Sequence, residues 1–225
     1  MQIKSFNSKI FVDVDLKNHL NEIFQKLTPA KVFILVDENT QKYCLPQLYK
    51  LINHEKVYVK SIDQGESNKT INTVTKIWNF LQENGGDRES LMINLGGGLL
   101  LDIGGFAAST FKRGFPYINI PTTLLSMVDA SVGGKVGFNF NDFKNHIGLF
   151  SQPYYVLVNP SFLLTLNQRH IFSGWAEMLK HGLIHDSTHL KKLLDTRPGV
   201  VKNDQMPELI GNSIKIKNYF VEQDP

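Results

Sequence analysis

The 225-residue sequence predicts an α/β fold: a doubly wound parallel sheet in an N-terminal domain, residues 1–160, followed by the start of an all-α C-terminal domain, residues 161–225. Two observations predict this division. Short runs rich in β-branched residues alternate with segments of helical period as far as Pro160, and beyond it the strand patterns stop. The chain is long enough to bury a full core without disulfide or metal staples.

Four segments have the composition of strands, and two of them are almost continuously apolar, as is typical of parallel strands covered on both faces. They are KVFILVDE (31–38), VYVKSID (57–63), SLMINLGG (90–97) and FPYINIP (115–121). Helices are predicted between and after these strands from capping residues, apolar spacing and terminal glycines. The predicted helices cover 40–53 with Thr40 as the N-cap, 69–84 before Gly85, a segment from Leu99, and then 168–183, 187–195 and 205–222.

Composition limits the classes of partner. The chain has 24 Lys+Arg against 21 Asp+Glu without a long run of like charges, so we expect no nucleic-acid partner. A single cysteine, Cys44, excludes an internal disulfide framework and suits a reducing compartment. The N-terminus lacks the apolar core of a signal peptide and no apolar run has the length of a membrane span, so we expect a soluble, cytoplasmic protein with no membrane partner.

Three glycines, Gly96 to Gly98, follow the third predicted strand and precede a predicted helix. Bare backbone N–H groups at a helix N-terminus, at the carboxyl end of a parallel strand, are typical of phosphate-binding turns. The spacing departs from G-x-G-x-x-G, and a tightly packed turn would also require glycine, so both explanations stay open. Asp102 is expected in the first helical turn, where a carboxylate gains from the dipole and can also reach a ribose.

The segment 111–150 places cations along glycine-rich, partly apolar chain, with Arg113, Lys135 and Lys144 beside Asp129 and Asn145. Arginine and lysine are seldom buried without a partner, so the grouping suggests an anionic, phosphorylated ligand. The alternative is that these are solvated loop charges paired with Asp129 and Asp142.

Several motifs together resemble the dehydroquinate synthase family of the sugar-phosphate cyclases. They are DQGESNK (63–69), GGGLLLDIGGF (96–106), the RG of Arg113 and Gly114, PTTLLSMVDASVGGKVGFN (121–139), KNHIGLF (144–150) and SGWAEMLKHGLI (173–184). The resemblance implies an NAD-dependent lyase of the shikimate pathway, which leads to chorismate and the aromatic amino acids. Such an enzyme converts 3-deoxy-arabino-heptulosonate 7-phosphate to dehydroquinate and phosphate with NAD and a divalent metal, zinc or cobalt. It implies a Rossmann-like N-terminal domain for NAD, a helical domain for metal and substrate, and a homodimer.

The resemblance also assigns residues. NAD would be bound by Asp37, Asn39, Glu66, Lys69, Gly97, Gly98, Leu99, Asp102, Thr122, Thr123, Lys144, Phe162 and Thr165. The sugar-phosphate substrate and its chemistry would fall to Arg113, Asp129, Lys135, Asn145 and Lys180, with Glu177 as a metal ligand.

A metal reading of His181 and His185 is also possible from spacing, because both would share a helix face with Glu177. Gly182 is a plausible helix end and argues against it. The family completes its metal site with histidines of a later Gly-His-Thr region, which this sequence does not contain. We therefore expect a chain truncated at its C-terminus relative to the family, which binds NAD but turns over no substrate alone.

Three alternatives remain open. Another sugar-phosphate cyclase shares most of these motifs. A metal-dependent polyol dehydrogenase shares the glycine turn, although Lys135, Lys144 and Asn145 as phosphate-seeking groups argue against it. The third is an NAD-binding or interaction module without activity.

Overall fold

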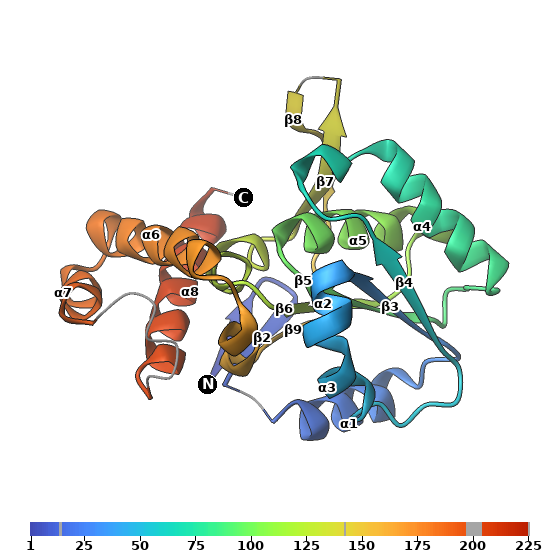
Figure 1. Cartoon of the computed structure of the whole chain (residues 1–225), viewed down its shortest axis with the longest axis horizontal. Coiled ribbons are helices and arrows are strands. Elements are labelled where there is room, and N and C mark those ends of the chain that lie inside the picture. The colour runs from blue at the N-terminus through green and yellow to red at the C-terminus, as the bar shows by residue number, and fades with distance from the viewer. Residues whose placement is uncertain (14, 142, 197–203, 225) are drawn as a thin grey trace.

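A seven-stranded sheet forms the centre of the computed structural model, which describes residues 1–13, 15–141, 143–196 and 204–224 (Figure 1). Its order across the described residues is β1-β2-β9-β6-β5-β3-β4, and only the β1–β2 pair is antiparallel. The strands are β1 (Gln2–Ser5), β2 (Ser8–Val12), β3 (Val32–Asp37), β4 (Val57–Ile62), β5 (Leu91–Gly96), β6 (Tyr117–Pro121) and β9 (Tyr155–Val158). The four predicted strands are thus confirmed as β3 to β6, whereas β1, β2 and β9 were not predicted.

Both faces of the sheet are covered, as a doubly wound fold requires. Along β3, Val32, Ile34 and Val36 belong to one apolar core, and Phe33 and Leu35 belong to a second. Because successive side chains of a strand point to opposite faces, the two cores lie on opposite sides of the sheet. The first core is closed by α1 (Leu16–Leu27) and α3 (Leu45–Tyr49), and the second by α4 (Ile71–Glu83) and α5 (Gly98–Thr110).

The predicted helix at 40–53 is split and begins earlier than expected. Asp37, not Thr40, is the N-cap of α2 (Glu38–Tyr43): its carboxylate accepts from the Thr40 N–H at 2.8 Å, and the Thr40 hydroxyl accepts from the Asp37 N–H at 2.8 Å. This reciprocal pair satisfies two N–H groups that would otherwise lack partners. Pro46 has no N–H to continue the helical bonding, so α3 begins as a separate helix.

After β9 the described residues form helices and the turns that connect them, without a further strand. The 3₁₀ segment η4 (Pro160–Thr165) leads to α6 (Gln168–Ile184), α7 (Ser187–Asp195) and α8 (Met206–Gln223), which confirms the three predicted helices. Gly182 does not end α6 as expected; a β-carbon there would lie 2.8 Å from the Leu190 Cα, so glycine allows α7 to approach closely. Trp175 and Ile210 share an apolar core with sheet residues, and the domain boundary at residue 160 stays a prediction.

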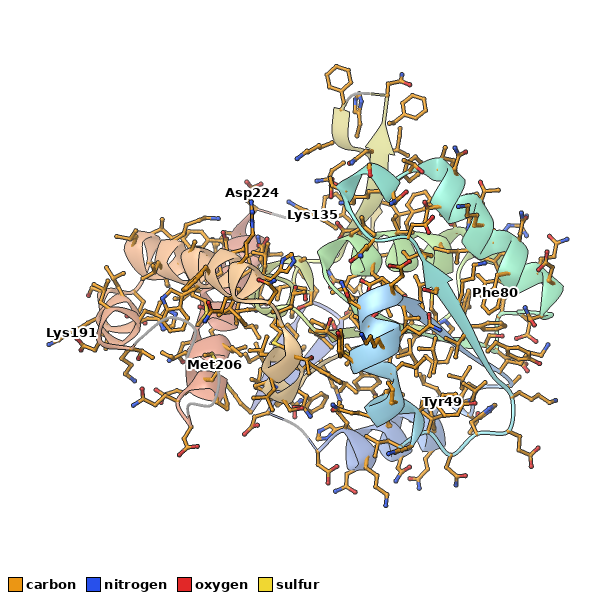
Figure 2. The ribbon with its side chains drawn as sticks, in the orientation of Figure 1. Tyr49, Phe80, Lys135, Lys191, Met206 and Asp224 are labelled. Atoms are coloured by element: carbon orange, nitrogen blue, oxygen red, sulfur yellow. The ribbon has the colours of Figure 1, made fainter. Side chains whose placement is uncertain are left out.

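The glycine-rich segment 111–150, in which the sequence predicted only the strand at 115–121, also contains a projecting hairpin of β7 (Lys135–Phe140) and β8 (Phe143–Phe150) (Figure 1). It follows η2 (Phe111–Arg113) and a π-helical turn, η3 (Ser126–Ala130). Lys135 begins β7 at the base of this hairpin (Figure 2). Asp142, one expected partner of the loop charges, lies outside the described residues. Among the helices described here, none combines the length and the apolar character needed to span a bilayer.

Gly104 is the point where α5 packs most tightly on the sheet. A β-carbon at this residue would lie 2.1 Å from Oδ1 of Asn94, a side chain with no exposed surface that donates to Asn119 at 3.0 Å. We expect Gly104→Ala to lower the free energy of unfolding by about 1–3 kcal/mol, because the buried pair cannot move aside without strain.

Gly211 in α8 is the matched control, because its added methyl group would meet only the flexible end of Met1. Gly211→Ala should change the unfolding free energy by less than about 1 kcal/mol. Urea unfolding of both variants tests the contrast, and equal stability of the two would contradict it.

Candidate functional site

A hollow of about 660 Å³ opens where the carboxyl ends of β3, β4, β5 and β6 meet. β3 pairs with β4 on one side and β5 on the other, so the chain reverses its winding direction at this crevice. Open α/β sheets bind ligands at such switch points. Every residue that the resemblance assigns to NAD lines this hollow, including Asp37 at the end of β3, Glu66 after β4 and Thr122 after β6. The lining also includes residues not predicted, among them Tyr43, Cys44 and Gln64.

The three glycines of the turn have different roles: Gly96 allows close packing of the turn, and Gly97 and Gly98 leave backbone N–H groups open to the hollow. A β-carbon at Gly96 would lie 2.8 Å from the Leu100 side chain, so Gly96 is required by the tight turn itself. Gly97 is the N-cap of α5 and Gly98 is its first residue, and both line the hollow. No side chain caps the helix here, so the first N–H groups of α5 are available to a ligand. The packing explanation therefore applies at Gly96, and the phosphate-binding explanation at Gly97 and Gly98 stays a prediction.

Asp102 is not a first-turn acid, which corrects the expectation from sequence. It is the fifth residue of α5, too far along to gain much from the helix dipole. Its carboxylate instead accepts a hydrogen bond from the Lys69 Nζ at 2.5 Å. Lys69 is only 4% exposed, and its Nζ also donates to the Asn145 Oδ1. A buried ammonium requires such partners, and they come from α5 and the β7–β8 hairpin.

Burial raises the pKa of the Asp102 carboxyl to about 6, while the charge and hydrogen bond of Lys69 act in the opposite direction. Glu66 and Asp129 raise this pKa further through charge repulsion. A carboxyl group with a raised pKa of this kind is common at functional sites.

A second hollow, of about 460 Å³, adjoins the first because Asp102 and Asn145 line both. Asp129 and Lys135 also line it, so three residues predicted for the substrate meet there. Asp129 accepts from the Lys217 Nζ of α8 at 2.7 Å. Sequence reasoning missed Lys217; the available signal was a lysine one helical turn from each of the apolar residues Ile214 and Val221.

Glu177 and Lys180 lie on α6, where the Lys180 Nζ donates to the Glu177 Oε1 at 2.7 Å. The same oxygen lies 3.3 Å from Nε2 of His181, a ring that is 2% exposed and whose pKa is lowered by burial. His185 instead stacks on Tyr219 of α8, with ring centroids 4.5 Å apart.

No group of three or more candidate ligands for a metal ion occurs in the described part of the chain. Glu177 with His181 offers one carboxylate and one imidazole, which do not make a complete metal site. The assignment of Glu177 as a ligand stays a prediction.

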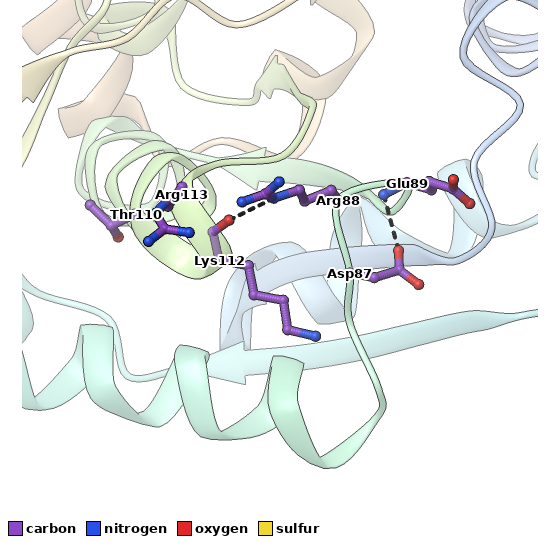
Figure 3. Close-up of a pocket in the computed structure, with 6 residues that line it drawn as sticks. All are labelled: Asp87, Arg88, Glu89, Thr110, Lys112 and Arg113. Carbon is purple, nitrogen blue, oxygen red and sulfur yellow. Dashed lines mark hydrogen bonds between the residues drawn. The ribbon is translucent and has the colours of Figure 1, made fainter.

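The structure separates Arg113 from the other predicted residues. It lies just beyond the C-terminus of α5, in an open hollow with Arg88, Lys112 and Glu89 (Figure 3). The glycine turn lies at the opposite end of this 13-residue helix, about 20 Å away. Lys112 and Arg113 both have left-handed backbone conformations, with φ of 51° and 71°. Arg113 is also absent from the residues of this chain that line the second hollow.

The fold and the hollow define a class: an α/β protein with a Rossmann-like, doubly wound sheet whose glycine turn and edge crevice suit a dinucleotide. Residues 59–173, just over half of the chain, match the family described as 3-dehydroquinate synthase N-terminal. The chain belongs to this 3-dehydroquinate synthase family.

Curated relatives of this chain carry the name of the same family. The 3-dehydroquinate synthase of Parabacteroides distasonis is 41% identical over 217 residues, covering 96% of this chain and 62% of that protein. The 3-dehydroquinate synthase of Clostridium tetani is 36% identical over 223 residues, covering 96% of this chain and 59% of that protein. The chain thus spans about 60% of the length of these relatives.

Solved structures support the fold. The 2-epi-5-epi-valiolone synthase of Streptomyces hygroscopicus subsp. jinggangensis, solved with NAD⁺ and Zn²⁺, has a TM-score of 0.81 at 28% identity over 99% of this chain and 62% of that one. A 2-deoxy-scyllo-inosose synthase complexed with carbaglucose-6-phosphate, NAD⁺ and Co²⁺ has a TM-score of 0.79 at 21% identity, covering 98% of this chain and 62% of that one. The second likeness concerns the fold alone.

The titration of Asp102 tests the pairing at the junction of the two hollows. Lys69→Met removes the nearby positive charge and the hydrogen bond, both of which lower the Asp102 pKa, and it leaves burial in place. We therefore expect the pKa of Asp102 in this variant to rise above about 6. Carbon-13 NMR of the carboxyl group measures this pKa.

Lys76→Met is the control, because Lys76 pairs with Asp63 on the exposed surface. An Asp102 pKa that stays the same in Lys69→Met would contradict the pairing of Asp102 with Lys69.

Proposed function

We propose that this chain carries the NAD-binding part, and part of the sugar-phosphate site, of a 3-dehydroquinate synthase. Such an enzyme converts 3-deoxy-arabino-heptulosonate 7-phosphate to dehydroquinate and phosphate. The observation that carries the proposal is the shared wall of the two hollows: Asp102 and Asn145 line both. A dinucleotide in the first hollow would therefore have its reactive end next to a sugar in the second.

The residues of the first hollow fit a dinucleotide. The uncapped N–H groups at Gly97 and Gly98 suit a pyrophosphate, and a β-carbon at either glycine would narrow the space through which it approaches. Asp37 and Glu66 offer carboxylates for ribose hydroxyls at the ends of β3 and β4. When bound, NAD supplies a hydride acceptor that returns the hydride later in the same turnover.

The residues of the second hollow suit an anionic polyol. Lys135 offers a cation to the phosphate group, and Asn145 offers a neutral amide. Asp129, held by Lys217, can accept hydrogen bonds from sugar hydroxyl groups. Fixed charges of this kind orient the substrate and stabilise the charge on departing phosphate. Lys180 and Glu177 would border the same substrate from α6. Arg113 is not assigned a role in substrate binding, because within one chain it lines a different hollow.

A divalent metal, zinc or cobalt, belongs to the proposed whole enzyme, but the described residues do not complete a site for it. No step is therefore assigned to the metal here. Cytoplasmic location and assembly as a homodimer belong to the same proposal, and analytical ultracentrifugation tests the assembly.

A different sugar-phosphate cyclase is the second candidate, because the valiolone synthase matches with a TM-score of 0.81 at 28% identity. Product analysis with six-carbon and seven-carbon sugar phosphates separates the two. A polyol dehydrogenase is disfavoured by Lys135 and Asn145 in the second hollow, and net NADH accumulation from an unphosphorylated polyol would favour it. A binding module without activity is the remaining possibility, and NAD binding without phosphate release by the complete enzyme would favour it.

NAD affinity of the chain tests the first hollow. Gly97 has φ of −82°, so alanine is tolerated by the backbone, but its methyl group would lie 3.3 Å from Thr123, beside the uncapped N–H groups. We expect Gly97→Ala to weaken NAD binding about ten-fold, a loss of about 1.4 kcal/mol. Isothermal titration calorimetry measures the affinity, with Gly211→Ala as the control for a glycine remote from the site. Failure of the unaltered chain to bind NAD at millimolar concentration would overturn the proposal.

Turnover by the 225 residues alone tests how much of the enzyme they contain. Because the described residues offer no complete metal site, we expect no steady release of phosphate from 3-deoxy-arabino-heptulosonate 7-phosphate with NAD and Zn²⁺ or Co²⁺ supplied. A coupled phosphate assay measures this. Steady turnover would show that the chain holds a complete active site and would refute the expectation.

A further inference from the structure

Asn139 contacts three residues of the proposed sites but lines neither hollow. Its backbone N–H donates to the Lys69 carbonyl at 2.8 Å, and its Nδ2 donates to the Glu66 Oε1 at 2.9 Å. Its Oδ1 accepts from the Asn145 N–H at 2.8 Å. The backbone N–H and the side chain of one half-buried residue thus join the loop before α4 to the β7–β8 hairpin.

These contacts coincide with an irregularity in the hairpin. Phe138 pairs with Ile147 and Phe140 pairs with Phe143, so Asn139 alone stands opposite the three residues from Lys144 to His146. Such a bulge redirects side chains out of the regular ladder, and it presents Lys144 and Asn145 to the first hollow.

The bulge needs external support. Asn145 has φ of 53°, a left-handed conformation that costs free energy for a residue other than glycine, and both Lys144 and Asn145 are exposed. The bond from the Asn145 N–H to Asn139 holds this backbone, and Lys69 holds the side chain. Glu66 is exposed as well, so the bond from Asn139 restricts a carboxylate that would otherwise sample several rotamers.

We propose that Asn139 is a positioning residue that locks Glu66 and Lys69 of the nucleotide hollow to the Asn145 bulge, so that both hollows are ordered together. The inference rests on the proposed NAD-binding function and adds a residue that does not itself touch the ligand. Its effect is preorganisation: the ordering is already present before NAD binds, and affinity is lost when the lock is removed.

An exchange of donor and acceptor tests the lock on the 225-residue chain. Asn139→Asp replaces the amide donor with a carboxylate facing Glu66, and we expect NAD affinity to fall about ten-fold. Glu66→Gln leaves the Asn139 amide an oxygen to donate to. In the double variant N139D/E66Q the new amide donates to the new carboxylate, so affinity should lie within about three-fold of that of Glu66→Gln alone.

Asn141→Asp is the matched control, since it makes the same chemical change two residues along in an exposed, left-handed position and should leave NAD affinity unchanged. Equal NAD affinity of Asn139→Asp and Asn141→Asp overturns the proposal. So does a double variant whose loss equals the product of the two single losses, because that result shows no coupling between the two side chains.

Hydrogen exchange separates this inference from the proposed function. If the unaltered chain binds no NAD, the function fails, and the lock is then measured without ligand. Asn139→Ala should speed exchange of the Asn145 amide, which loses its acceptor, whereas Asn141→Ala should not. Unchanged exchange at Asn145 in Asn139→Ala overturns the positioning role.

Discussion

The buried charge of Lys69 is the constraint on which the rest of the site depends. Moving an ammonium out of water costs several kcal/mol unless it is paired and hydrogen-bonded. Its partners come from elements far apart in sequence, Asp102 of α5 and Asn145 of the hairpin. The charge therefore fixes how α5, the loop before α4 and the β7–β8 hairpin lie against one another, and both hollows share the resulting wall.

The glycines of α5 allow this arrangement. Gly104 brings the helix onto the buried Asn94–Asn119 pair, so the sheet and α5 are in direct contact below the hollow. At the N-terminus of α5, no side chain caps the first N–H groups at Gly97 and Gly98. Helix α5 is thus packed tightly against the sheet at Gly104, and its N-terminal N–H groups have no side-chain partner. Backbone N–H groups at a helix N-terminus favour the binding of phosphate groups.

Helices α6 and α8 also contribute charged side chains to the ion pairs of the predicted site residues. Lys217 of α8 holds Asp129, and Lys180 of α6 holds Glu177. Each carboxylate already has a cation partner within the described residues, whereas a complete set of metal ligands is missing there. The family relatives are longer than this chain, so the activity of the whole enzyme stays a proposal while membership of the family does not.

The sequence by itself determined the strands β3 to β6 and the helices after Pro160, because long apolar runs and helical spacing are local signals. Its motifs also selected the residues that line the first hollow. The sequence could not determine β9 or β1, since four-residue strands carry too little pattern, nor the Asp37 cap, since Asp37 and Thr40 are both good capping residues.

Tertiary structure alone decided the pairing of Asp102 with Lys69, the contact of Lys217 with Asp129, and the distance of Arg113 from the other site residues. Each depends on where the chain returns after many residues, and the burial of Lys69 requires its charge to be paired.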